Sequence, residues 1–301
     1  MADPTYVRQY FSDHAVEWLS GAYDDPRAYP IGAHRVRIAI EAITERIGLT
    51  GSLIDLGCGG GDLCLMAAQL GMDVTGVDIA EGMTAEAERR AAVLPDGLRG
   101  RLRFRLGDAL EATGRYDAVT ALGLIEYLPG DEPFFRHADE LLRPGGVLVV
   151  SCRNRLFNLA SLNAHTLNEV QTGRAKALLD EIGALRPSRD RLRDFLRRLE
   201  EVLPALQTAL AADLREEPAP PDGFAQGRRQ HTPAGLAQAA RAAGFERPQF
   251  VGVHPHPLLP WIEPVAPRFY NLLASAFESL ERTAMSLAWS SAFIGIFSRS
   301  C

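Results

Sequence analysis

Apolar and polar positions follow two different periods along the chain, and their order predicts a layered domain. Seven short stretches read as strands: 53–56, 72–79, 101–106, 116–122, 147–152, 248–253 and 292–297. Others carry apolar residues at helical spacing: 34–47, 63–70, 81–94, 133–142 and 234–243. Helices that separate short apolar strands indicate βαβ units. The pattern therefore predicts an α/β fold around one sheet.

A long polar and helical stretch interrupts this alternation after Arg153. Pro187 and Ser188 can cap a helix within it, and the proline-rich segment 217–223 reads as a linker. Thr232 and Pro233 then suit the start of a helix that returns to the core. The resulting domain prediction is a core of residues 1–153 and 231–301, with a mostly helical insertion at 154–230.

The stretch Leu53-Ile-Asp-Leu-Gly-Cys-Gly-Gly-Gly-Asp62 predicts a buried strand that ends in a tight, glycine-rich turn. A dinucleotide-binding loop requires glycines at relative positions one, three and six, but the sixth position from Gly57 is Asp62. A pyrophosphate ligand is therefore disfavoured. Asp55 suits a ligand with an ammonium group, and Asp78, at the end of the next strand, can accept both hydroxyls of a ribose. A ligand that joins an amino acid to an unphosphorylated ribose fits both acids.

These residues resemble the class I S-adenosylmethionine-dependent methyltransferases. The glycine loop, the ribose acid Asp78 and an adenine-side acid Asp108 match that family in order and spacing, and 116–127 and 141–150 are typical of its fourth and fifth strands. The resemblance implies a Rossmann-like seven-stranded methyltransferase sheet with a helical insertion after the fifth strand. It implies S-adenosylmethionine as cofactor, bound by Asp55, Gly57, Cys58, Gly59, Asp78, Ile79, Met83, Asp108, Ala109 and Leu124. An ordinary glycine-rich turn in an α/β core is the alternative.

The resemblance implies roles for two further segments, the N-terminal stretch and the insertion. Aromatic residues between Tyr6 and Tyr23 suit a helix with one apolar face, which can pack against the sheet edge. In many small-molecule methyltransferases an N-terminal helix instead lies over the cofactor, so an aromatic side chain here could close the site. The insertion leaves the carboxyl end of a strand, where open α/β sheets bind ligands, and is expected to act as a substrate lid.

Composition and net charge limit the classes of binding partner that we expect for this protein. The formal net charge of -6 argues against a protein that grips a nucleic-acid backbone by bulk electrostatics. The N-terminus shows no secretory signal, and the uncharged stretch 284–297 is too short to span a bilayer, so we expect a cytoplasmic protein without a membrane partner. The cysteines, Cys58, Cys64, Cys152 and Cys301, form no CxxC pair and suit a reducing compartment. A homodimer is left open.

Methyl transfer to an alcohol, a phenol or a protonated amine benefits from a base. The candidates are Glu126, Tyr127, His165, His231, His254 and His256. Glu126 and Tyr127 follow the predicted fourth strand, where the family places residues that face the transferred methyl group, and His231 stands where the insertion rejoins the core. We therefore predict His231, Tyr127 and Glu126 as catalytic residues. No HExxH or zinc-type Cys/His set is present, so no metal is expected.

The sequence thus predicts an S-adenosylmethionine-dependent methyltransferase that acts on oxygen or nitrogen of a small molecule, for example a natural-product or sugar intermediate. The alternative is a protein that binds S-adenosylmethionine without transferring the methyl group, either a regulator or an inactive partner subunit. Intact Asp55, Gly57, Gly59 and Asp78 favour binding in both cases.

Overall fold

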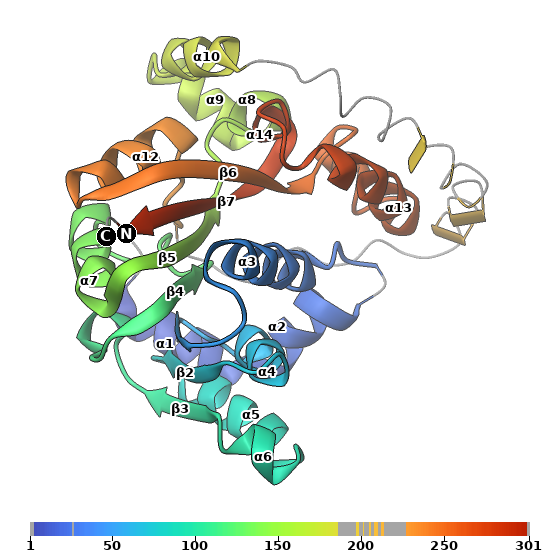
Figure 1. Ribbon diagram of the computed structural model, residues 1–301. Coiled ribbons are helices and arrows are strands. Elements are labelled where there is room, and N and C mark those ends of the chain that lie inside the picture. The colour runs from blue at the N-terminus through green and yellow to red at the C-terminus, as the bar shows by residue number, and fades with distance from the viewer. Residues whose placement is uncertain are drawn as a thin grey trace.

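A computed structural model describes residues 3–25, 27–185 and 227–299, with short pieces at 197–198, 201, 205, 208–209 and 212–213. Seven strands form one sheet in the order β3-β2-β1-β4-β5-β7-β6 (Figure 1). They are β1 (Ser52–Leu56), β2 (Asp73–Asp78), β3 (Leu102–Leu106), β4 (Tyr116–Leu122), β5 (Leu142–Arg153), β6 (Phe245–Pro255) and β7 (Ser290–Arg299). The first five strands are parallel, and β7 is antiparallel to both β5 and β6. The predicted α/β fold with a seven-stranded sheet is confirmed.

Helices cover both faces of the sheet. On one face lie α3 (Ile31–Ile47) and α4 (Asp62–Gln69), and on the other α7 (Asp131–Leu141) and α12 (Pro233–Ala242). Neighbouring strand residues therefore both enter apolar cores: Leu53 and Val149 pack with α3 and α4, whereas Ile54 and Val150 pack on the opposite face. Burial on both faces explains why the central strands read as continuous apolar runs rather than as alternation.

The boundaries differ from the predicted ones where polar residues conceal an element. β6 begins at Phe245 rather than at 248, because a register shift between Glu246 and Gln249, with Arg247 at φ 49°, interrupts its pattern. The segment between the predicted helix at 81–94 and the predicted strand at 101–106 contains α6 (Asp96–Arg99), a short helix after α5 (Glu81–Ala92). The predicted cap at Thr232 is confirmed, since its side chain accepts a hydrogen bond from Gly235 N at 3.1 Å.

The N-terminal segment forms three pieces instead of one helix. These are α1 (Pro4–Asp13), α2 (Ala15–Leu19) and the π-helix η1 (Ser20–Asp24). The break falls at His14, whose backbone lies at φ -113° and ψ 20°, outside helical values. α1 packs on α5, so close that a Cβ on Gly82 would lie 2.2 Å from the Ser12 carbonyl oxygen.

The described part of the insertion contains α8 (Asn158–Ser161), α9 (Ala164–Gln171) and α10 (Ala175–Ala184). These helices gather beside α14 (Ser286–Trp289) at the β6 side of the sheet, away from β1 and β2 (Figure 1). The predicted cap at Pro187 and Ser188 and the predicted linker at 217–223 lie outside the described residues.

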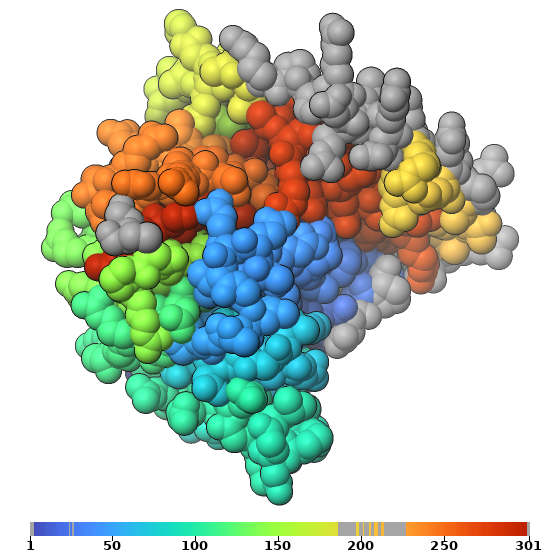
Figure 2. Space-filling model, viewed as in Figure 1, coloured from blue at the N-terminus to red at the C-terminus, as the bar shows by residue number. Residues whose placement is uncertain are grey.

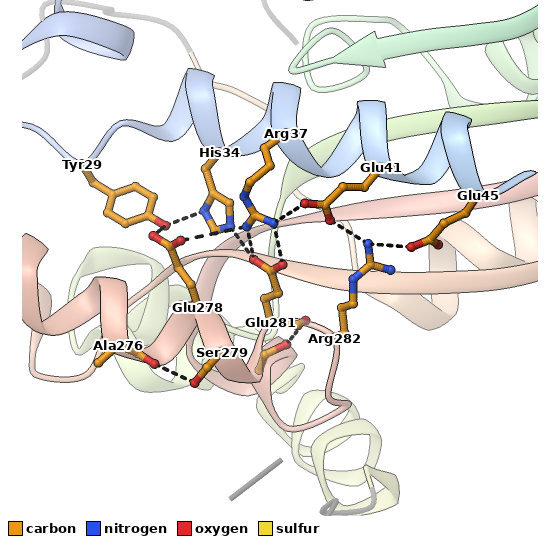
Figure 3. Close-up of polar contacts among 11 residues, drawn as sticks. Tyr29, His34, Arg37, Glu41, Glu45, Ala276, Glu278, Ser279, Glu281 and Arg282 are labelled. Carbon is orange, nitrogen blue, oxygen red and sulfur yellow. Dashed lines mark hydrogen bonds and ion pairs between the residues drawn. The ribbon is translucent and has the colours of Figure 1, made fainter. Parts of the chain in front are cut away.

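A polar network joins α3 to the segment that follows α13 (Pro267–Phe277) (Figure 3). His34 Nε2 lies 2.6 Å from Glu281 Oε2, and the Arg37 guanidinium donates two hydrogen bonds to the same carboxylate, at 2.5 and 3.1 Å. In the space-filling view α3 (blue) lies between the α4 region (cyan) and the C-terminal segment (red) (Figure 2). The network therefore fixes the C-terminal extension against the core. Within the described ranges, every helix is too short or too polar to span a bilayer.

Candidate functional site

A cavity of about 570 Å³ lies at the carboxyl ends of β1, β2 and β4. Its walls come from the N-terminal helices, the glycine loop, the segments after β2, β4 and β5, and the end of β6. Of the predicted cofactor-binding residues it brings together Gly57, Gly59, Asp78, Ile79, Met83, Asp108, Ala109 and Leu124. This is the edge at which open α/β sheets bind ligands.

The glycine loop turns back onto β2. The backbone N–H groups of Gly57 and Cys58 both donate to the Val77 carbonyl, at 2.8 and 3.0 Å. Gly57 has a φ of 71°, and a Cβ there would lie 3.1 Å from Leu124 Cδ1. A side chain at Gly57 would thus be both strained and crowded, which explains the glycine and leaves the backbone open to the cavity.

Asp78 is positioned by backbone groups on either side. Its Oδ2 accepts from Gly59 N at 2.8 Å, and its Oδ1 accepts from Ala80 N at 2.9 Å. Burial raises the pKa of Asp78, although the hydrogen bonds from Ala80 and Gly59 oppose this effect. Each carboxylate oxygen keeps a second acceptor position, so the side chain can still receive hydroxyl groups from the cavity.

Asp108 and Ala109 form a further part of the cavity wall. Asp108 caps a short 3-10 helix by accepting from Leu110 N at 2.8 Å. Its carboxylate is exposed and retains acceptor positions.

Asp55 and Cys58 do not line the cavity. Asp55 is only 3% exposed and accepts from Thr120 Oγ1 at 2.7 Å, and burial raises its pKa to about 7. The prediction that Asp55 contacts an ammonium group directly is therefore not supported by its position. Asp55 instead holds the end of β1 against β4 beneath the loop.

Arg35 is a cavity residue that the sequence interpretation missed. It comes from α3, and its Nη1 lies 3.0 Å from the point where a Cβ on Gly123 would stand. Its Nε is buried and has no hydrogen-bond partner in the part of the chain that the structure describes. The available signal was an arginine beside the core residues Val36 and Ile38 of an amphipathic helix.

Glu126 and Tyr127, both predicted as catalytic, line the cavity beyond Leu124. Glu126 is 5% exposed, its Oε2 lies 3.8 Å from Arg153 Nε, and that oxygen has no hydrogen-bond partner among the described residues. Burial and the nearby Glu126 carboxylate raise the pKa of Tyr127, which therefore stays protonated.

His231, the third predicted catalytic residue, lies away from the cavity. Its Nε2 is 2.9 Å from Asp131 Oδ1, and its backbone pairs with the end of β5 through Arg153 O and Arg155 N, at 3.0 and 2.8 Å. At 6% exposure it is a buried residue that joins the returning chain to the sheet. This position corrects the expectation that His231 faces an acceptor.

The other three histidine candidates differ in whether they line the cavity. His165 is exposed on α9 and does not line the cavity, whereas His254 and His256 do. Burial, helped by the charge of His254, lowers the pKa of His256 to about 2, so His256 is neutral at physiological pH. A group with so low a pKa is a weak base.

The outer wall comes mainly from the N-terminal helices, through Pro4, Val7, Phe11 and Trp18. The Phe11 ring meets Tyr127 edge to face, with ring centroids 5.6 Å apart. Of the described insertion residues only Phe157 and Arg228 reach the cavity. A lid role for the insertion stays a prediction, because most of 186–226 lies outside the described ranges.

Part of the chain matches known proteins in sequence. A family described as methyltransferase domain matches residues 54–148. A ubiquinone biosynthesis O-methyltransferase from Azoarcus sp. (strain BH72) is 32% identical over 159 residues, which cover 52% of this chain and 65% of the relative. The enzyme of the same name from Pseudomonas aeruginosa (strain UCBPP-PA14) is 36% identical over 121 residues, 39% of this chain and 51% of the relative. The chain therefore spans between half and two thirds of these relatives.

Solved structures resemble the fold along its whole length. Magnesium protoporphyrin IX methyltransferase from Synechocystis PCC 6803, with bound SAH, has a TM-score of 0.57 at 19% identity and covers 99% of this chain and 100% of its own. The [4+2]-cyclase SpnF has a TM-score of 0.56 at 18% identity and covers 99% and 97%. The domain match identifies residues 54–148 as a methyltransferase domain, and the likeness to these solved structures shows that the chain shares their fold.

Proposed function

We propose that this chain binds S-adenosylmethionine in the cavity and methylates an oxygen atom of a small-molecule acceptor. The observation that carries the proposal is the continuity of the cavity, which joins the glycine loop and Asp78 to the buried carboxylate of Glu126. Cofactor and acceptor can then meet in one space.

The residues on the cofactor side fit this ligand. Asp78 accepts the ribose hydroxyls, and Asp108 and Ala109 border the adenine. The methionine end lies near Gly57 and Leu124, where the Arg35 guanidinium, with its buried and unpartnered Nε, pairs with the carboxylate. When bound, the cofactor supplies an electrophilic methyl group on a sulfonium.

The acceptor side can position a hydroxyl group and take its proton. Glu126 has a buried oxygen that is ready to accept a hydrogen bond, and the protonated Tyr127 hydroxyl can donate one. Positioning alone is worth on the order of 7–11 kcal/mol in favourable cases, and a base adds about a hundred- to ten-thousand-fold in rate. Glu126 therefore takes over the role that the sequence interpretation gave to His231.

Oxygen is favoured over nitrogen by the curated relatives, which are named O-methyltransferases. Arg153 and Arg228 also line this end of the cavity, and they suit an acceptor that carries a negative or strongly polar group. A natural-product or sugar intermediate with an acidic substituent meets both conditions.

Transfer of a labelled methyl group tests the proposal. Hydroxylated and amine-bearing acceptors of the same skeleton are compared, and S-adenosylhomocysteine binding is measured by calorimetry. Glu126→Gln should lower the rate about a hundredfold or more and leave cofactor affinity within a few fold. Glu132→Gln, an exposed carboxylate on α7, is the matched control and should change neither.

A cofactor-binding protein without methyl transfer is the second candidate. It is favoured by one comparison, since a neighbour of similar fold is described as a [4+2]-cyclase. Tight binding of S-adenosylhomocysteine with no labelled product from any acceptor would support this candidate and reject methyl transfer.

A further inference from the structure

Two histidines and a glutamate form a separate cluster at the acceptor end of the cavity. His254 and His256 stand two residues apart at the end of β6, and Glu263 follows in the next segment. One potential ligand atom from each of the three lies within 4.8 Å of the others. Both imidazoles line the cavity, although His254 has a φ of 55° and His256 follows the last residue of β6.

The distances suit ligands of one metal ion. His254 Nε2 and Glu263 Oε1 are 3.3 Å apart, and His256 Nδ1 is 3.8 Å from Glu263 Oε2. Metal bonds of about 2.0–2.2 Å in a tetrahedral arrangement separate neighbouring ligand atoms by roughly 3.3–3.5 Å. His254 Nε2 and Glu263 Oε1 already have this separation. His256 has Nε2 left to bind the ion, because its Nδ1 lies against the Tyr270 hydroxyl.

Hydrogen bonds within the protein leave the ligand atoms of these side chains unused. Tyr270 Oη donates its single hydrogen to Leu258 O at 2.8 Å and therefore accepts from His256 Nδ1–H at 2.9 Å. Metal-binding histidines are commonly held in this way by the nitrogen that does not bind the ion. The Nε2 atoms of His254 and His256 are buried, and neither has a hydrogen-bond partner in the described chain.

A second cluster of the same residue types shows what an internally satisfied arrangement looks like. His34, Glu278 and Glu281 also lie within ligand distance of one another. There, however, Tyr29 and Glu281 occupy the two nitrogens of His34, and Arg37 neutralises Glu281 (Figure 3). The cavity cluster has no arginine or lysine in an ion pair with Glu263 in the described residues. Its carboxylate thus lacks the cation that the other cluster contains.

We propose that His254, His256 and Glu263 bind one divalent transition-metal ion, Zn²⁺ or an ion of similar preference, with an open coordination position toward the cavity. Three protein ligands of the N, N, O type with a vacant fourth position are the usual arrangement of a zinc ion that acts on a ligand. The ion's role toward the acceptor, as a Lewis acid that binds its oxygen, rests on the proposed methyl transfer. Binding of the ion itself does not.

The sequence alone indicates this metal site only weakly. A His-Pro-His run at a strand end is a single short motif, and the third member, Glu263, follows after a segment of prolines and apolar residues. Because the chain has no recognised metal motif, its sequence predicts no metal. The fold brings the carboxylate to the two imidazoles.

Titration with Co²⁺ tests the site in the full-length protein after chelator treatment. The expected result is one bound ion per chain, seen by calorimetry and as a visible ligand-field absorption band. The double variant His254→Gln/Glu263→Gln should weaken Co²⁺ binding well beyond the 10- to 100-fold typical of lost supporting contacts around a metal. His165→Gln, which removes an exposed histidine on α9, is the matched control and should bind as the unmodified protein does.

Calorimetry with S-adenosylhomocysteine is run on every variant to show that it is folded. Absence of stoichiometric Co²⁺ binding in the unmodified chain would overturn the proposal. So would a double variant that binds Co²⁺ as tightly as the control. If the unmodified protein binds Co²⁺ but transfers no methyl group, only the proposed function fails. Failure of the metal site and failure of the proposed function are therefore distinguishable.

Discussion

Replacement of Asp78 by asparagine should separate the two tasks that this carboxylate performs. In the structure each oxygen accepts a different backbone N–H, from Gly59 at 2.8 Å and from Ala80 at 2.9 Å. An asparagine amide offers one acceptor and one donor, so one of these N–H groups loses its partner. Such a loss costs about 1–3 kcal/mol of folding free energy.

The same change should also weaken binding of the cofactor product, S-adenosylhomocysteine. A hydrogen bond to a charged acceptor is worth about 1.5–3 kcal/mol, so the Kd of S-adenosylhomocysteine should rise roughly ten- to a hundredfold. Because burial raises the pKa of Asp78, affinity for the unmodified chain should fall as the pH decreases toward that pKa. The asparagine variant should lack this pH dependence.

Asp117→Asn provides the matched control. Asp117 also accepts from a backbone N–H, that of Ser52 at 2.8 Å, but it does not line the cavity. Urea unfolding should show similar losses of stability in both variants, while calorimetry shows a changed Kd for Asp78→Asn only. A folded Asp78→Asn protein whose Kd stays within about twofold of the control would refute the placement of the ribose.

Three further outcomes are expected. His231→Ala should lower the free energy of unfolding by about 1–3 kcal/mol, because it removes the contact with Asp131. The rate of methyl transfer by the folded variant should stay within about threefold of that of the unmodified protein. A larger loss of rate would restore His231 as a base. Burial opposes ionisation of Glu281, but hydrogen bonds from His34 and Arg37 outweigh it and lower the pKa of this carboxyl group. The ionised Glu281 therefore stabilises the fold above about pH 4.3, and this stabilisation is lost as the pH falls through the folded-state pKa. Urea unfolding should then show Glu281→Gln costing more at pH 7 than at pH 3, and an equal cost at both would contradict this. Phe11→Ala should raise the Kd of S-adenosylhomocysteine about two- to tenfold through loss of the ring at Tyr127, whereas Tyr6→Ala on the same helix should not.

The sheet could be predicted because its residues obey one physical rule. Strands buried on both faces are mostly apolar, and the stretches at 53–56, 116–122 and 147–152 follow this rule in their buried parts except at Asp55, Thr120 and Ser151. The ends of the strands were harder to predict, because the first residues of β6 include polar ones and Arg247 has a positive φ. The break at His14 also escaped prediction, because no proline or glycine marks it.

The candidate site was predictable where one short segment forms it. Gly57, Gly59 and Asp78 belong to a single βαβ unit, so their spacing along the chain fixes their spacing in the cavity. Arg35 comes from a helix that precedes the sheet, and His256 directly follows β6, the strand at the far edge. No local pattern records that they meet, and for the same reason chain order gave no warning that His231 turns away toward Asp131.

The position of β7 has a consequence for biosynthesis. β7 pairs with both β5 and β6, so the strand that is latest in sequence fills an interior place in the sheet rather than an edge. While the ribosome is still adding residues 290–299, β6 has no partner on the side that faces β5. The half of the cavity wall that carries His254 and His256 can therefore be assembled only after release of that segment from the exit tunnel, although β1 to β5 and the glycine loop can fold earlier. A chaperone that binds the nascent chain would meet an exposed β5 edge throughout this interval.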